Sequence, residues 1–150
     1  MHLPLIGRGT VTHVPTEMGV VGLLTRREVL LESIQARESV ALAGLGAATG
    51  GQSLCGLSRG AAPQSTVKYH EGAAAALAEA RRVVRAVAEG PGAADAVRSV
   101  LLDVRARWLE QSRSTGRTGP SWTSYLAGGL DALEQLVGAD RGSGMHDGTN

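Results

Sequence analysis

The side chain best suited to covalent chemistry is the thiol of Cys55, the only cysteine in the chain. The sequence pattern predicts a helix that begins near residue 65, and a helix N-terminus lowers the pKa of a nearby thiol. His70 could then serve as the base that activates this nucleophile. A thiol enzyme is therefore one hypothesis. The alternative is that Cys55, close to Leu54 and Leu57, is a small buried hydrophobic residue.

Two other patterns with a chemical meaning are incomplete. Residues 44–51 are rich in glycine and look like a dinucleotide-binding loop. Such a loop needs a preceding strand and further strand–helix units, which the rest of the chain does not supply. The four histidines are scattered without a helical i, i+4 pair, so they predict no metal site. They are His2, His13, His70 and His146. We expect no cofactor and no metal.

Composition and charge limit the class of protein. The chain has 150 residues, which suits one domain, and a net charge of +1 from 15 basic and 14 acidic residues. No segment carries the block of positive charge that drives non-specific binding to nucleic acid. No apolar run approaches the length of a membrane span, and the first residues do not have the pattern of a signal peptide. We expect a cytoplasmic protein that does not enter a membrane.

The apolar periodicity predicts an all-α fold, a four-helix bundle made of two helical hairpins. Thr25 and Glu28 form a capping-box pattern that begins a helix over 26–43. Residues 44–64 contain six glycines and Pro63 and are expected to form a loop. The apolar stripe of the first helix comprises Leu30, Leu31, Ile34, Ala41 and Leu42.

Three further helices follow from caps and breakers. The second is expected to be capped by Ser65 or Thr66 and to stop before Gly90, and the third covers 93–113. The fourth begins after a cap at Ser121 and ends at Gly138. The domain organisation is then an extended N-terminal arm over 1–24, a helical domain over 25–138 and a flexible tail over 139–150.

Small residues form ridges on the second and fourth helices. Glycine inside a helix costs about 1 kcal/mol relative to alanine, so a close helix contact should offset that cost. The ridges either pack on each other within one chain or face another subunit. The predicted helix-contact residues are Gly72, Ala76, Ala80, Gly128 and Ala132.

The same two helices suggest an internal repeat. Four residues of the second helix recur in the fourth at a constant offset of 56 positions. Such a match indicates either a duplicated helical hairpin or a chance alignment of alanine-rich helices. The matching sets are Tyr69, Gly72, Ala76 and Leu77, and Tyr125, Gly128, Ala132 and Leu133.

An up-and-down bundle would gather all four aromatic residues at one end, together with several cations. Two helix N-termini beside cations would favour a small anion or an acidic side chain of a partner. The alternative is an aromatic cluster that seals the end of the bundle. The predicted residues for ligand or partner binding are Arg59, Lys68, Tyr69, His70, Trp108, Arg113, Trp122 and Tyr125.

A family resemblance supplies another hypothesis. Residues 24–30 (LTRREVL) resemble the opening of the LuxR-type helix-turn-helix domain, and residues 65–70 (STVKYH) resemble the start of its recognition helix. The intervening segment is longer and richer in glycine than in that family. The resemblance implies DNA binding, with Thr66, Lys68 and His70 facing the duplex.

The sequence as a whole favours a non-catalytic protein. We expect a homo-oligomer or an adaptor that binds protein partners through its small-residue helix faces and its N-terminal arm. Sequence-specific DNA binding is the first alternative. The second is a site for a small anionic ligand, or a thiol enzyme, at the aromatic end of the bundle.

Overall fold

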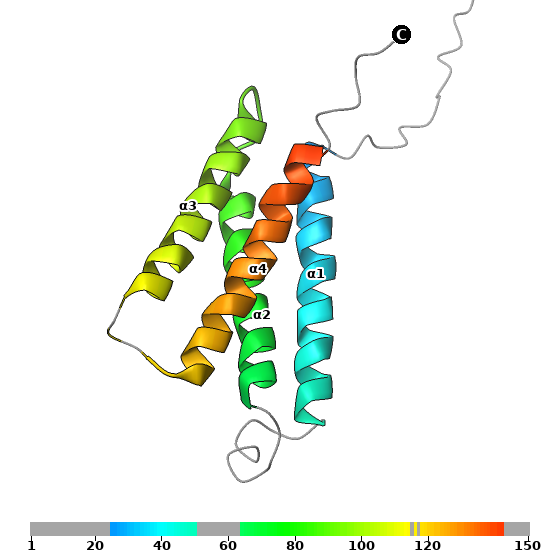
Figure 1. Cartoon of the computed structure of the whole chain (residues 1–150). Helices are drawn as coiled ribbons and strands as arrows, with labels where there is room; N and C mark the ends of the chain where they lie inside the picture. The colour runs from blue at the N-terminus through cyan, green and yellow to red at the C-terminus, as the bar shows by residue number, and fades with distance from the viewer. Residues whose placement is uncertain (1–24, 51–63, 115, 117, 143–150) are drawn as a thin grey trace, which may run out of the picture.

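The computed structural model describes residues 25–50, 64–114, 116 and 118–142, and all of its regular structure is helical (Figure 1). The prediction of an all-α fold with four helices is confirmed. The arm predicted over 1–24 lies outside the described residues, as does most of the predicted tail. The helices are α1 (Arg26–Thr49), α2 (Gln64–Ala86), α3 (Ala93–Arg113) and α4 (Pro120–Gly142).

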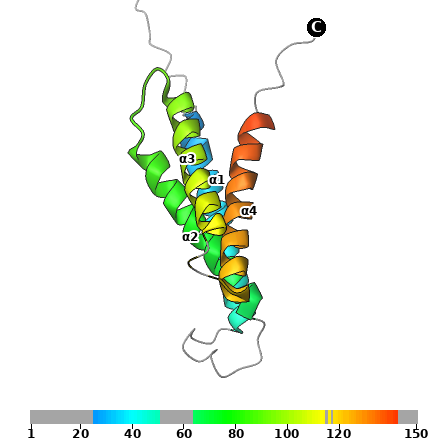
Figure 2. The ribbon, with the colours of Figure 1, turned by 60° about the vertical axis from the view of Figure 1, so that its left-hand side comes forward.

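The four helices form an up-and-down bundle in which α2 is central. Helices α1 and α3 run one way, and α2 and α4 run the other way, so α2 and α4 are parallel (Figures 1 and 2). Helix α2 packs most extensively against α4 and next against α1. Helices α1 and α4 make few contacts with each other because both lie against α2. The bundle is therefore open between α1 and α4.

Helix α1 begins as predicted and ends later than predicted. The Thr25 side chain accepts a hydrogen bond from the Glu28 amide at 3.3 Å, and the Glu28 carboxylate accepts one from the Thr25 amide at 2.7 Å. The predicted end at residue 43 is wrong, because the helix continues to Thr49 and ends where Gly50 adopts a left-handed φ of 60°. The contact of this glycine-containing stretch with α2 offsets its low helix propensity.

Helices α2 and α4 depart from prediction at their ends. Ser65 and Thr66 are not caps of α2, because the helix already includes Gln64, whereas α3 has the predicted bounds. Ser121 is not the cap of α4, because Pro120 is already helical, as proline at the first helical position often is. Gly138 does not end α4 either. The helix continues to Gly142, since the buried Leu136 and Val137 hold this part of α4 in the bundle.

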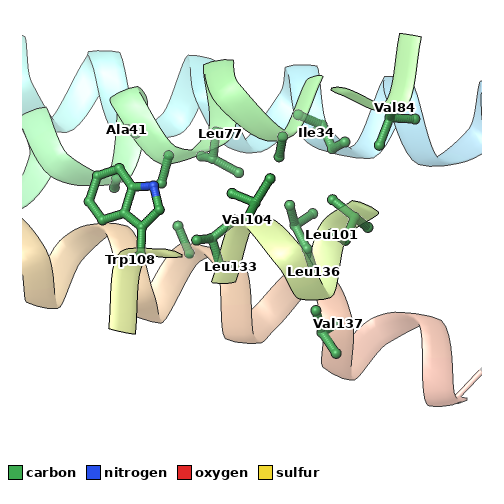
Figure 3. Close-up of a cluster of buried hydrophobic side chains, with 14 of the residues drawn as sticks. Ile34, Ala41, Leu77, Val84, Leu101, Val104, Trp108, Leu133, Leu136 and Val137 are labelled. Carbon is green, nitrogen blue, oxygen red and sulfur yellow. The ribbon is translucent and has the colours of Figure 1, made fainter. Parts of the chain in front are cut away.

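The core lies where all four helices meet (Figure 3). Branched aliphatic side chains fill it, and small residues on α2 let the neighbouring helices approach. Leu42 does not join it, because half of its surface, 52%, is exposed. The most completely buried large side chains are Ile34, Leu77, Val84, Val104, Leu133 and Leu136.

Candidate functional site

Three of the four aromatic residues stack at the junction of α3 and α4. Tyr125 lies between two indoles, with ring centroids 5.5 Å from Trp108 and 5.3 Å from Trp122 and interplanar angles of 22° and 11°. Trp108 is only 4% exposed, and the ring also lies against Gly129, where a Cβ would overlap it. This stack joins the end of α3 to the beginning of α4 and contributes to stability through offset aromatic contact.

A carboxylate of α2, that of Glu79, binds the Trp108 ring of the stack. Glu79 accepts hydrogen bonds from the indole N–H of Trp108 at 2.9 Å and from the Arg107 guanidinium at 2.7 Å. Burial acts to raise the pKa of Glu79, but these two hydrogen bonds and the charges of Arg107 and Arg82 outweigh it, so the pKa lies below its ordinary value. Glu79 could not be predicted as a partner of Trp108, because nothing in helical spacing links the two residues.

The fourth aromatic residue, Tyr69, contacts His70 and Asp131 and does not join the stack. It stands edge-on to His70, with centroids 5.7 Å apart, and its hydroxyl donates a hydrogen bond to Asp131 at 2.9 Å. That hydrogen bond, burial and the negative charge of Asp131 raise the pKa of Tyr69. Burial likewise raises the pKa of Tyr125. The predicted aromatic end is thus a stack of three rings, with Tyr69 paired separately.

Among the described residues, the cations predicted at this end do not converge on a common anion-binding site. Lys68 forms an ion pair with Glu71 at 2.7 Å, and His70 lies against Gly44 of α1, where a Cβ would overlap its ring. Arg113 is exposed in the last turn of α3. Arg59 and Cys55 lie outside the described residues, so the anion-binding and thiol-enzyme hypotheses stay predictions.

The small-residue ridges of α2 and α4 meet each other. A Cβ at Gly72 would overlap the carbonyl oxygen of Tyr125, and a Cβ at Gly128 would overlap that of Tyr69. Ala76 and Ala80 are fully buried, and Ala132 is nearly so. Within the described chain these ridges bring α2 and α4 into backbone contact, which is the first of the two arrangements considered for them.

An apolar groove follows the open side of the bundle. It has a volume of about 380 Å³ and runs between α1 and α4, with α2 as its floor. Tyr69 and His70 lie at one end, and the Arg37 guanidinium donates a hydrogen bond across it to the Gln135 side chain at 2.7 Å. Its wall and floor residues include Ala36, Val40, Ala73, Leu77 and Ala132. Such a lining can bind an apolar surface.

The outer face of α1 is apolar and exposed. Val40 exposes 72% of its surface, and no residue from Ser39 to Thr49 is charged. This face was not predicted, because residues 44–49 were expected to form a loop. Residue periodicity could have shown it, since α1 has apolar residues on all sides.

At the opposite end of the bundle, Arg27 connects the beginning of α1 to the end of α2. Its guanidinium donates hydrogen bonds to the carbonyl oxygens of Val84 at 3.2 Å and Arg85 at 2.7 Å, and it forms an ion pair with Glu89 at 2.8 Å. These carbonyls belong to the last turn of α2, where no further helical turn follows to supply amide donors, and the Val84 carbonyl also accepts a hydrogen bond from the Val87 amide at 3.2 Å. A smaller groove of about 270 Å³ lies beside it, between Leu30 and Val97.

Comparison with known proteins adds no family. The chain matches no protein-family description, no curated protein and no solved structure. Among the helices that the structure describes, none combines the length and the apolar character needed to cross a bilayer. The described residues also contain no group of three or more His, Cys, Asp or Glu side chains that could hold a metal ion.

Proposed function

We propose that this protein is a non-catalytic oligomerisation or adaptor protein that binds protein partners through the outer face of α1. The observation that carries the proposal is the exposed, uncharged second half of that helix. Val40 and Leu42 expose 72% and 52% of their surfaces there. A helix with apolar residues on all sides is normally covered, and an exposed apolar patch commonly marks a protein interface.

The groove beside α1 supports the same proposal. Val40 and Ala36 belong both to the exposed face and to the apolar wall of the groove between α1 and α4. A helix from a partner could lie along α1 and cover both surfaces, which is a common way in which helical proteins bind one another. The small-residue ridges of α2 and α4 are occupied within the chain, so we assign the partner surface to α1 instead.

We propose that the N-terminal arm also contributes to this interface. Residues 1–24 precede Thr25 directly, and Thr25 caps the helix that carries the partner surface. Segments that extend from a helix terminus can gain order on a neighbour. The arm of one molecule would then add contact area to the α1 interface of the next.

Light scattering of the purified full chain tests the proposal. We expect a mass above the 15.4 kDa of one chain, decreasing on dilution. Val40→Asp should shift the protein to a monomer without changing its helical circular dichroism or melting temperature, because the side chain is mostly exposed. Leu102→Asp is the matched control on α3, where 38% of the side chain is exposed, and it should leave association unchanged. A monomeric wild-type chain at all concentrations would contradict the proposal.

The alternatives gain no support from the described residues. Of the three residues that would face DNA, Lys68 is paired with Glu71, His70 packs on Gly44, and Thr66 is exposed. DNA binding stays a prediction that a titration with duplex DNA at several salt concentrations would test. The thiol-enzyme hypothesis depends on Cys55 and would be tested by the loss of activity in Cys55→Ser.

A further inference from the structure

The exposed side of α1 has the spacing of a coiled-coil seam. Its residues recur at alternating steps of four and three, which is the spacing of d and a positions in heptads. Val29 and Val40 expose 51% and 72% of their surfaces, and the others are exposed or half-buried. The seam spans about 27 Å at the rise of an α-helix. Its members are Val29, Ser33, Ala36, Val40, Ala43 and Ala47.

We propose that the partner of this seam is α1 of a second copy of the chain, aligned parallel and in register. This inference rests on the proposed function and specifies its partner. In a parallel, in-register pair each seam residue meets the same residue of the second copy. Val29 therefore packs on Val29, and Val40 packs on Val40. The alanines at 36, 43 and 47 let the two backbones approach closely. The seam therefore complements itself.

Charged residues beside the seam favour the parallel direction. Glu32 occupies a g position and Arg37 the following e position, five residues later. In a parallel two-stranded pair a g residue lies opposite the next e residue of the other helix, so Glu32 of each chain meets Arg37 of the other. An antiparallel pair would place g positions opposite g positions, and those after Glu32 are Ser39 and Gly46. Only the parallel arrangement makes two opposite-charge contacts.

The groove beside α1 is consistent with the same arrangement. Arg37 lies at its rim, where it donates a hydrogen bond to Gln135 of α4. Ala36 and Val40 line both the groove and the seam, so a second α1 lying on the seam also covers one wall of the groove. Arg37 has to exchange Gln135 for the carboxylate of the second copy, which is the stronger acceptor.

A charge exchange tests the pairing. Glu32→Arg places like charges opposite Arg37 of the second copy, and we expect the dimer dissociation constant to rise by about tenfold. Combining Glu32→Arg with Arg37→Glu should restore the wild-type constant, because the opposite-charge contacts are re-formed between chains. Glu32 and Arg37 lie on opposite sides of the seam and do not contact each other within one chain. Recovery of the dissociation constant in the double variant therefore reports a contact between chains. A double variant no tighter than the single variant would overturn the inference.

Disulfide formation tests the register, in a Cys55→Ser background. Val29→Cys and Ala43→Cys should each form a covalent dimer on oxidation, because both are d positions that meet themselves only in a parallel, in-register pair. Gln35→Cys, on another exposed face, is the control and should not form one. Linkage only when the Val29→Cys variant is mixed with an Ala47→Cys variant would show an antiparallel pair, in which d positions face a positions, and would overturn the inference. If the chain associates but neither cysteine links, the pairing is wrong while the proposed function stands; a wild-type monomer contradicts both.

Discussion

Gly128 in α4 lies directly against the main chain of Tyr69 in α2, where a Cβ would overlap the tyrosine carbonyl oxygen. Gly72 has the same relation to Tyr125. Because α2 and α4 are parallel, the two contacts relate these helices by a local two-fold arrangement. The sequence match between the same positions agrees with this geometry, and gene duplication stays a prediction. Both glycines serve close approach, not backbone freedom, since neither has a positive φ.

Substitution of Gly128 should separate α2 from α4. A Cβ there meets backbone atoms, which cannot move aside as a side chain can, so Gly128→Ala should lower the free energy of unfolding by about 1–3 kcal/mol and Gly128→Leu by more. Gly138→Ala is the matched control, because it lies in the same helix and a Cβ there meets nothing within 4 Å. It should stabilise by about 0.5–1 kcal/mol. Urea unfolding measures both, and equal effects would contradict the close contact.

Removal of the Arg27 side chain should weaken the attachment of α1 to the end of α2. Arg27→Ala deprives the Val84 and Arg85 carbonyl oxygens of a charged donor, and we expect a loss of about 1–2 kcal/mol of unfolding free energy. Arg26→Ala is the control, since Arg26 is its exposed neighbour on the same turn. If thermal unfolding shows no difference between the two variants, the carbonyl contacts do not contribute to stability.

The lowered pKa of Glu79 predicts an acid-sensitive stability. A carboxyl group whose pKa is lower in the folded state binds its proton more readily when unfolded, so its contribution is complete above the unfolded pKa. It is lost as the pH falls through the folded pKa, below the ordinary range of glutamate. Chemical unfolding over the acidic range should therefore show a smaller decrease for Glu79→Gln than for the wild-type chain. Parallel curves for the two proteins would exclude this role.

Deletion of residues 1–20 tests the assignment of the arm. If the arm contacts a neighbouring molecule, the shortened chain should associate more weakly while its melting temperature at a dilution that gives monomers stays the same. Sedimentation and circular dichroism measure the two quantities. Equal loss of association and of folding stability would mean that the arm packs on its own chain.

The sequence predicted most of what depends on local patterns. The capping box at Thr25, the number of helices and the small-residue contact at Gly72 and Gly128 follow from spacing alone. The end of α1 was wrong because the propensity of Gly44 and Gly46 was weighed without the packing of α1 on α2. The predicted end of α4 at Gly138 was wrong for the same reason, since tertiary contacts stabilise the helix beyond this glycine.

Polar side-chain contacts between helices could not be predicted. Glu79 meets Trp108, and Arg27 reaches the end of α2, only because particular helix faces come together. A single sequence has no pattern that specifies such registers. The aromatic end was predicted from bundle topology, which places helix ends correctly. It does not give side-chain directions, so the pairing of Tyr69 with Asp131 and His70, apart from the stack, could not be predicted.

The aromatic stack determines what the protein's intrinsic fluorescence reports. The chain has two tryptophans, and both belong to the stack with Tyr125 where α3 meets α4. Emission therefore follows the integrity of that junction alone, whereas the far-ultraviolet dichroism sums all four helices. Because α1 touches the rest of the bundle mainly through α2, its detachment would change the dichroism and leave the emission constant. The two signals together separate release of α1 from collapse of the remaining three helices.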